Sequence, residues 1–190
     1  ELNGTRYKLA TNSSSNDIAC HLHGGDKGFD QKVWDAESLT EGSSQGVKLK
    51  LFSPEGEEGY PGNLTVTVHY WLHSDNSLEI KYHAITDQAT PVSLTNHSYF
   101  NLKGEGNGDV LAHQIQIHSE AFTPVTPGMI PTGEVLPLKN TPLDFNTPQA
   151  IGAQVDSDHP QLQFAGGYDH NYILDTNSGK PKLVATVSEA

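Results

Sequence analysis

Apolar and polar residues alternate along most of this chain, a pattern typical of strands that bury one face. Pro54 and the turn-forming run at 73–77 separate neighbouring stretches of alternation. Helical spacing is weak and predicts no more than one short turn, within residues 147–155. The pattern predicts an all-β fold, a sandwich or barrel with mostly antiparallel strands. The strands are expected at 46–54, 63–72, 77–85, 91–100 and 113–119.

Residues 120–148 differ in kind, because they are rich in proline and contain few alternating pairs. Apolar residues recur through them, which predicts an ordered, extended surface segment rather than a free linker. These are Phe122, Val125, Ile130, Leu136, Leu143 and Phe145. A chain of 190 residues suits one domain, and we expect residues 1–190 to form a single domain. Residues 1–10 resemble a strand and turn already in progress, and 183–190 a strand just begun, so both ends look cut.

The formal net charge of −12 argues against nucleic acid or an anionic membrane surface as a partner, whereas a neutral small molecule is compatible with it. No apolar run approaches the ~20 residues of a membrane span. The single cysteine, Cys20, excludes an internal disulfide and is interpreted as a small, partly buried apolar residue. Because no targeting segment is seen, the cytoplasm is the default expectation for its location.

Three polar clusters, far apart in the sequence, share histidine, glycine and acidic or amide residues. They are HLHGGDKGFDQKVW at 21–34, TNHSYFNL at 95–102 and GGYDHNYIL at 166–174. In the first, His21 and His23 would face the same side of a strand. Any one histidine is more often an ordinary hydrogen-bonded residue. Together, the clusters predict a shared concave site. The histidines interpreted as ordinary are His69, His73, His83, His113, His118 and His159.

Two kinds of chemistry fit such clusters. A His-x-His pair begins the metal site of the cupins, but no glutamate follows His23 at the required spacing, so we expect no metal. Histidine with a carboxylate, and no serine or cysteine nucleophile motif, favours proton transfer on an uncharged substrate. Sugars are suitable ligands, because one carboxylate can accept hydrogen bonds from two adjacent hydroxyls.

Five sequence blocks, in order, resemble the aldose 1-epimerase (galactose mutarotase) family. The resemblance implies a large antiparallel β-sandwich and an enzyme, an isomerase that interconverts the α and β anomers of free hexoses such as glucose and galactose. It implies no cofactor. The blocks are LHGGDKGFDQKVW, SPEGEEGYPG, TNHSYFNLKG, IPTGE and YDHNY.

The same resemblance assigns roles to site residues. It implies that His97 is the general acid that protonates the sugar ring oxygen, and that His23 hydrogen-bonds the same region. Asp169 is expected to bind sugar hydroxyls, and Ser98 and Tyr99 to line the pocket.

The family's catalytic base is a glutamate on a later strand, and one sugar-binding arginine precedes the matching part. Neither Glu189 nor Arg6 stands in the corresponding context. We therefore expect this 190-residue chain by itself to be poorly active or inactive. Missing strands would leave sheet edges open, which predicts a tendency to self-associate.

Two alternatives remain open at this point. An epimerase of the same fold acting on hexose 6-phosphates would require arginine or lysine at the phosphate. A carbohydrate-binding module would bind sugar without turnover.

Overall fold

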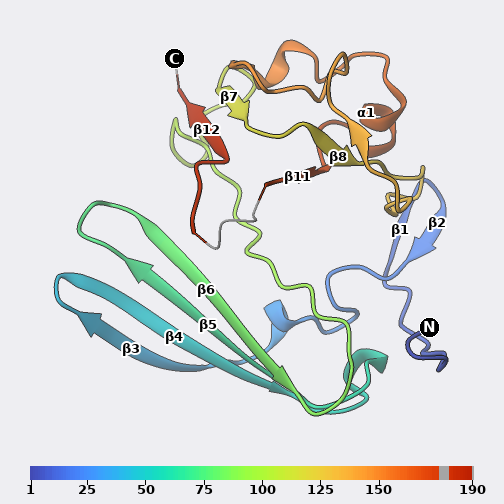
Figure 1. Ribbon diagram of the computed structural model, residues 1–190, viewed down its shortest axis with the longest axis vertical. Coiled ribbons are helices and arrows are strands. Elements are labelled where there is room, and N and C mark those ends of the chain that lie inside the picture. Colours follow the sequence, from blue (N-terminus) through green and yellow to red (C-terminus); the bar gives the residue numbers. More distant parts are fainter. Residues whose placement is uncertain (176–179, 190) are drawn as a thin grey trace. The chain divides into compact units, whose positions relative to one another are not determined.

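The computed structural model describes residues 1–175 and 180–189. The chain divides into two compact units, which are described here one at a time. The first comprises Glu1–Ser13 and Ala19–Asn96, and the second Ser14–Ile18 and His97–Ala190. The short strands β1 (Ser13–Ser15) and β2 (Ile18–Cys20) pair with each other. The elements are labelled in Figure 1.

The first unit is built on a four-stranded antiparallel sheet in the order β3-β4-β5-β6. The last three strands confirm the predicted ones at 46–54, 63–72 and 77–85. The first strand was not predicted, because its sequence DAESLTE is mostly polar and only Leu39 is partly buried. The bounds are β3 (Asp35–Glu41), β4 (Ser44–Ser53), β5 (Leu64–Leu72) and β6 (Leu78–Thr86).

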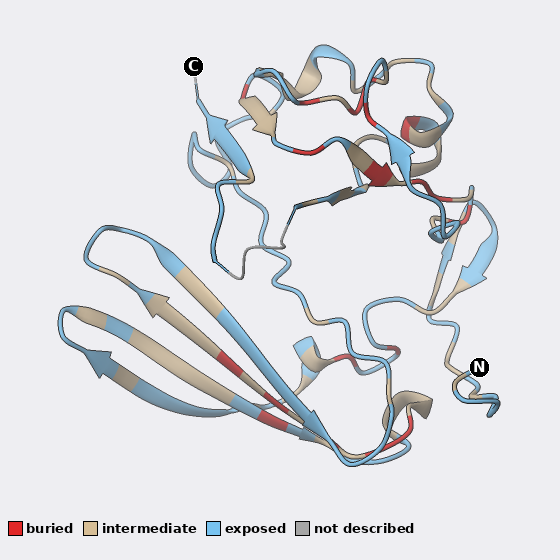
Figure 2. Ribbon diagram, viewed as in Figure 1, coloured by how far each residue is buried: buried red, intermediate tan, exposed pale blue. Residues whose placement is uncertain are grey.

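Strand β5 supplies the core of the first unit. Leu64, Val66 and Val68 are buried, while the threonines between them are only partly covered. Figure 2 shows buried positions as red bands within the sheet. Alternation with period two therefore places one face of the sheet in the core, as the sequence predicts. Partly buried side chains pack against this face; they are Phe29, Trp34, Leu49, Tyr70, Ile80 and Leu94.

The second unit contains two three-stranded antiparallel sheets, in the orders β10-β7-β12 and β11-β8-β9. Strand β7 confirms the strand predicted at 113–119, and β12 confirms the strand predicted to begin within 183–190. Ala190, the last residue of that prediction, lies outside the described residues. The bounds are β7 (Gln114–Ile117), β8 (Ala121–Thr123), β9 (Leu136–Pro137), β10 (Gln149–Ala150), β11 (Asn171–Ile173) and β12 (Ala185–Ser188).

Helical structure is short throughout the described chain. The predicted turn within 147–155 corresponds to the 3-10 helix Ile151–Ala153. The α-helix α1 (Pro160–Ala165) was not predicted, although its boundaries are legible. Proline occupies its first turn, the His159 side chain accepts from the Gln161 amide, and Gly166 ends it in the left-handed conformation. Two further 3-10 helices span Phe29–Gln31 and Glu57–Gly59.

Residues 120–148 form much of the core of the second unit, so their prediction as a surface segment was wrong. Leu138 and Leu143 are fully buried and pack with Phe122 and Leu162. Val125 and Phe145 are also buried, whereas Ile130 and Leu136 are exposed. Proline has no backbone N–H to donate to a neighbouring strand, so this proline-rich segment stays largely irregular. Most of the apolar side chains named here are nevertheless buried.

The strand predicted at 91–100 is also absent from the described structure, in which residues 89–101 form neither helix nor strand. Most side chains of this stretch are exposed, and the buried face that alternation would require is missing. At the N-terminus, a single bridge between Leu2 and Thr5 closes a turn in place of the expected strand. The organisation of residues 1–190 as one domain stays a prediction.

We predict that Leu143→Ala lowers the free energy of unfolding by about 2–5 kcal/mol, because it empties a fully buried position. Leu136→Ala, in the same proline-rich segment but 40% exposed, should change stability by less than about 0.5 kcal/mol. Urea denaturation of both variants measures the difference. Equal effects would show that the burial of Leu143 does not stabilise the fold.

Candidate functional site

His23 lies on a glycine turn in the first unit. The Gly25 amide donates to the Leu22 carbonyl at 3.1 Å, and His23 has a φ of 52° with both following glycines also at positive φ. A Cβ on Gly28 would come within 2.3 Å of the His23 carbonyl oxygen, so only glycine fits there. The turn leaves the His23 side chain exposed.

His21 does not share a face with His23, because no strand forms there. The half-buried His21 ring lies between the Ala10 carbonyl, 2.8 Å from Nδ1, and the Tyr60 hydroxyl, 2.7 Å from Nε2. Its role is to join three segments of the first unit. Burial, and then the nearby charge of Glu58, raise the pKa of Tyr60.

Glu58 holds the loop that follows His23. Its two carboxylate oxygens accept from the amides of Asp26 and Lys27, each at 3.0 Å. A Cβ on Gly25 would come within 2.2 Å of this carboxylate, which explains the second glycine. Hydrogen bonds from amides to an ionised carboxylate are stronger than neutral ones. The blocks LHGGDKGFD and SPEGEEGYPG therefore form one interlocked structure.

His97, Ser98 and Tyr99 lie together on an exposed, irregular stretch at the start of the second unit. The rings of His97 and Tyr99 are 5.0 Å apart between centroids and inclined by 31°. Tyr99 is 89% exposed, which is unusual for a large aromatic side chain. Polar and aromatic groups presented in this way are available to contact a ligand.

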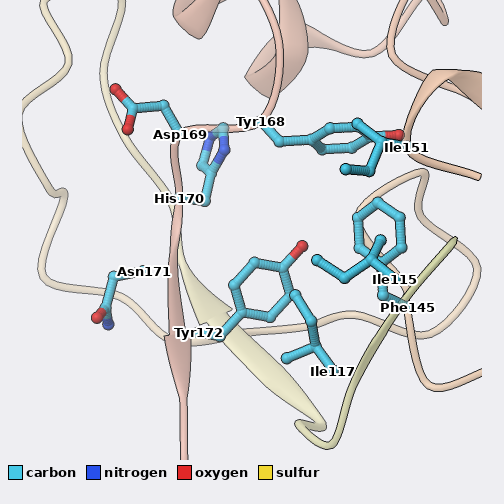
Figure 3. Close-up of a pocket in the computed structure, with 9 residues that line it drawn as sticks. All are labelled: Ile115, Ile117, Phe145, Ile151, Tyr168, Asp169, His170, Asn171 and Tyr172. Carbon is cyan, nitrogen blue, oxygen red and sulfur yellow. The ribbon is translucent and has the colours of Figure 1, made fainter. Parts of the chain in front are cut away.

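Asp169 lies at the edge of a cavity of about 490 Å³ in the second unit. In Figure 3, Tyr168, His170 and Tyr172 project toward the apolar wall, while Asp169 and Asn171 project to the opposite side of the backbone. This alternation continues strand β11, whose register with β8 pairs Asn171 with Thr123. The wall is lined by Ile115, Ile117, Phe145 and Ile151.

Two of the inward-facing residues near Asp169, His170 and Tyr172, are held by hydrogen bonds. Gln161 Oε1 lies 3.1 Å from His170 Nε2, and because an amide oxygen can only accept, this nitrogen carries the proton. The side-chain amide of Gln161 also bonds both backbone groups of Val125: its oxygen accepts from the Val125 amide, and its nitrogen donates to the Val125 carbonyl. The Tyr172 hydroxyl donates to the Leu143 carbonyl at 2.9 Å. Burial raises the pKa of Tyr172. Burial also lowers the pKa of His170, against an opposing effect of the Asp169 charge.

Four of the five predicted site residues, namely His97, Ser98, Tyr99 and Asp169, belong to the second unit, and His23 belongs to the first. Their convergence on one concave site stays a prediction. Sequence reasoning missed Glu58, Gln161 and the structural importance of His170. The available signal for Glu58 was the pair of glutamates in SPEGEEGYPG. This pair directly follows a glycine, and the block is one of the five that resemble the family.

Within the described part of the chain, no group of three or more histidine, cysteine, aspartate or glutamate side chains is arranged to hold a metal ion. The helices in residues 1–175 and 180–189 are all too short to cross a membrane. Cys20 is half-buried at the end of β2.

The structure defines an antiparallel all-β protein whose candidate residues lie on irregular segments. The family model for aldose 1-epimerase matches residues 1–190, and the chain belongs to this family. It is 41% identical over 179 residues to galactose mutarotase from Sus scrofa, covering 94% of this chain and 48% of the relative. With aldose 1-epimerase from Escherichia coli it shares 37% identity, over 89% of this chain and 47% of that protein. The chain thus spans about half the length of these curated relatives.

Solved structures confirm the fold class. The crystal structure of galactose 1-epimerase from Lactobacillus acidophilus matches with a TM-score of 0.79 and 32% identity, over 89% of this chain and 48% of that one. An aldose epimerase homologue from C. elegans matches with a TM-score of 0.75 over 100% of this chain and 54% of its own length. At 22% identity, the second match supports the fold alone. The predicted galactose mutarotase-like antiparallel β-sandwich is therefore confirmed as the fold class.

We predict that acid weakens the fold through His170. Since burial holds its folded-state pKa below the ordinary value of 6.5, the unfolded chain takes up the proton first as the pH falls. Stability should decrease as the pH drops below about 6.5 and level off below the folded-state pKa. In urea denaturation at pH 7.5 and 5.0, His170→Asn should depend less on pH than the unsubstituted chain. Identical pH dependence would contradict this assignment.

We also predict that Glu58→Ala destabilises the loop that carries His23. The amides of Asp26 and Lys27 should exchange with solvent faster, and the free energy of unfolding should fall by about 1–3 kcal/mol. Hydrogen exchange followed by NMR measures the first effect and urea denaturation the second. Glu55→Ala is the matched control, because it removes an exposed carboxylate three residues before Glu58, in the loop that contains Glu58. Unchanged exchange in Glu58→Ala would show that the loop does not depend on the carboxylate.

Proposed function

We propose that the protein containing this chain interconverts the α and β anomers of free hexoses, with galactose or glucose as substrate. The observation that carries the proposal is the match of the whole chain, residues 1–190, to the aldose 1-epimerase family. Relatives named galactose mutarotase and a solved galactose 1-epimerase point to the same substrate class. A neutral sugar is also compatible with a formal net charge of −12.

In this proposal His97 is the acid of the ring-opening step. Its imidazolium donates a proton to the ring oxygen while a base takes the proton of the anomeric hydroxyl, and the bond between C1 and the ring oxygen breaks. The resulting aldehyde turns about the C1–C2 bond, and the reverse transfers close the ring as the other anomer. An imidazole suits this work because it can both give and accept a proton near neutral pH. The exposure of His97 leaves room for a sugar beside it.

The remaining predicted residues bind and orient the sugar. Asp169 accepts hydrogen bonds from two adjacent hydroxyls, and its outward direction is set by the half-buried neighbours Tyr168 and His170 on the other side of the backbone (Figure 3). His23 hydrogen-bonds the reacting end of the sugar. Ser98 and Tyr99 line the same pocket, where an exposed aromatic ring can cover an apolar sugar face.

The reaction is an isomerisation: the bond between C1 and the ring oxygen breaks and re-forms, the protons that are moved are returned, and no electrons are gained or lost, so its balance requires no cofactor. The expected lack of a nucleic-acid or membrane partner rests on the acidic charge. Self-association through sheet edges stays a prediction.

The direct test is polarimetry of α-D-galactose mutarotation with the complete protein in which this sequence occurs, after subtraction of the uncatalysed rate. We expect His97→Asn to lower the catalysed rate by about 10²–10⁴-fold, the usual contribution of a positioned acid or base. Galactose binding, followed by saturation-transfer NMR, should be weakened mainly by Asp169→Asn. His118→Asn, which replaces another exposed histidine of the second unit, is the matched control.

Two outcomes would contradict the proposal. Binding of galactose without any acceleration by the unsubstituted protein would favour a carbohydrate-binding module. Acceleration with hexose 6-phosphates but not with free hexoses would instead assign the protein to phosphorylated sugars.

A further inference from the structure

His170 is held by one hydrogen bond and one ring contact, on the side of the backbone opposite to Asp169 (Figure 3). Its Nε2–H donates to Gln161 Oε1, with 3.1 Å between the two atoms. Its ring meets the ring of the buried Phe122 edge to face, with 5.7 Å between centroids. The other ring nitrogen, Nδ1, is buried and has no hydrogen-bond partner among the described residues. The contact with Gln161 is therefore the hydrogen bond that fixes the rotation of the ring.

Gln161 joins the His170 ring to a second backbone segment. Its side-chain oxygen also accepts from the Val125 amide at 2.8 Å, and its side-chain nitrogen donates to the Val125 carbonyl at 2.9 Å. Because both ends of the side-chain amide are engaged, the Gln161 side chain cannot rotate without breaking hydrogen bonds to the buried Val125. A glutamine of α1 thus gives His170 a fixed acceptor.

This bridge stands where the pairing of β8 with β11 ends. The last paired residues are Thr123 and Asn171. The next position would bring Pro124 opposite His170, and proline has no backbone N–H to donate. Immediately beyond this point, Gln161 bonds the backbone that follows Pro124 and also bonds the His170 ring. A side chain therefore connects the two segments where the ladder stops.

The segment that carries Asp169 has a fixed start as well. Gly166 ends α1 in the left-handed conformation, with a φ of 66°. The amides of Gly166 and Gly167 both donate to the Leu162 carbonyl, the second at 3.0 Å. Asp169 lies two residues after this glycine cap and one residue before His170. Its backbone is thus held on one side by the cap and on the other by the His170 ring.

We propose that His170 is a positioning residue for Asp169, and that Gln161 holds the His170 ring in place. Neighbouring residues of an extended segment project to opposite sides, so a His170 ring held inward keeps the Asp169 carboxylate directed outward (Figure 3). A carboxylate that is already directed can bind sugar hydroxyls without the cost of first becoming ordered. This inference rests on the proposed role of Asp169 in binding the sugar. It assigns no proton transfer to His170.

The first test compares His170→Phe with His170→Gln in the complete protein. Phenylalanine keeps a ring against Phe122 but cannot donate to Gln161, whereas glutamine places an amide nitrogen near the position of Nε2 and retains the donor. We expect KM for galactose to rise about tenfold in His170→Phe, with a smaller change in kcat, and to recover partly in His170→Gln. Gln161→Leu should resemble His170→Phe. Gln163→Leu is the matched control, because it replaces an exposed glutamine of the same helix that bonds Asp158 and not His170.

A double-mutant cycle separates positioning from general damage to the fold. If His170 acts through the Asp169 carboxylate, His170→Phe should change kcat/KM by less than about twofold once Asp169→Ala has removed that carboxylate. An equal loss with and without Asp169→Ala, or an unchanged KM in His170→Phe, would overturn the positioning role while leaving the proposed function intact.

If the unsubstituted complete protein neither binds galactose nor accelerates its mutarotation, the proposed function fails, and NMR relaxation still decides the inference. The backbone order parameter of Asp169 should be about 0.85 in the unsubstituted protein, typical of rigid backbone, and should fall toward about 0.6 in His170→Phe and Gln161→Leu. Gln163→Leu should leave it unchanged. An Asp169 order parameter that is equal in all variants would overturn the role of the hydrogen bond between Gln161 and His170.

Discussion

Irregular backbone in this protein depends on side chains that satisfy its amide groups. A segment outside helices and sheets still carries one donor and one acceptor per residue, and these need partners wherever water is excluded. Glu58 accepts from two consecutive amides beyond His23, Gln161 bonds both backbone groups of Val125, and His113 accepts from Leu102. Glu58 and Gln161 come from more than 30 residues away and His113 from 11 residues away, so the irregular segments are held by contacts between separate parts of the chain.

The sheets provide the frame for these contacts. In the first unit, the alternation of β5 buries Val66 and its neighbours and leaves the connecting loops to carry polar groups. In the second unit, a core around Phe122 and Leu143 packs against the Tyr168 and Tyr172 rings beside the cavity. The direction of Asp169 follows from this packing, because an extended segment that half-buries residues 168, 170 and 172 turns residue 169 the other way.

The histidines show how far burial changes the role of one residue type. His23 and His97 are exposed, as ligand contact requires, whereas His113 is buried and has two polar neighbours. His170 lies between them in exposure, and burial lowers its pKa. All four residues are histidines in polar stretches of the sequence. Only the burial and contacts of each ring distinguish a histidine that could bind a ligand from one that supports the structure.

The sequence by itself determined the all-β class, the three long strands of the first sheet, and the family. Alternation with period two is a local property, and the family's motifs are runs of adjacent residues. The tertiary structure decided that residues 120–148 turn inward, that 91–100 is not a strand, and that Glu58 and His113 hold the loops of the candidate site. The two loop contacts join residues 11 to 32 positions apart in the sequence, and a local pattern of alternation contains no signal for them.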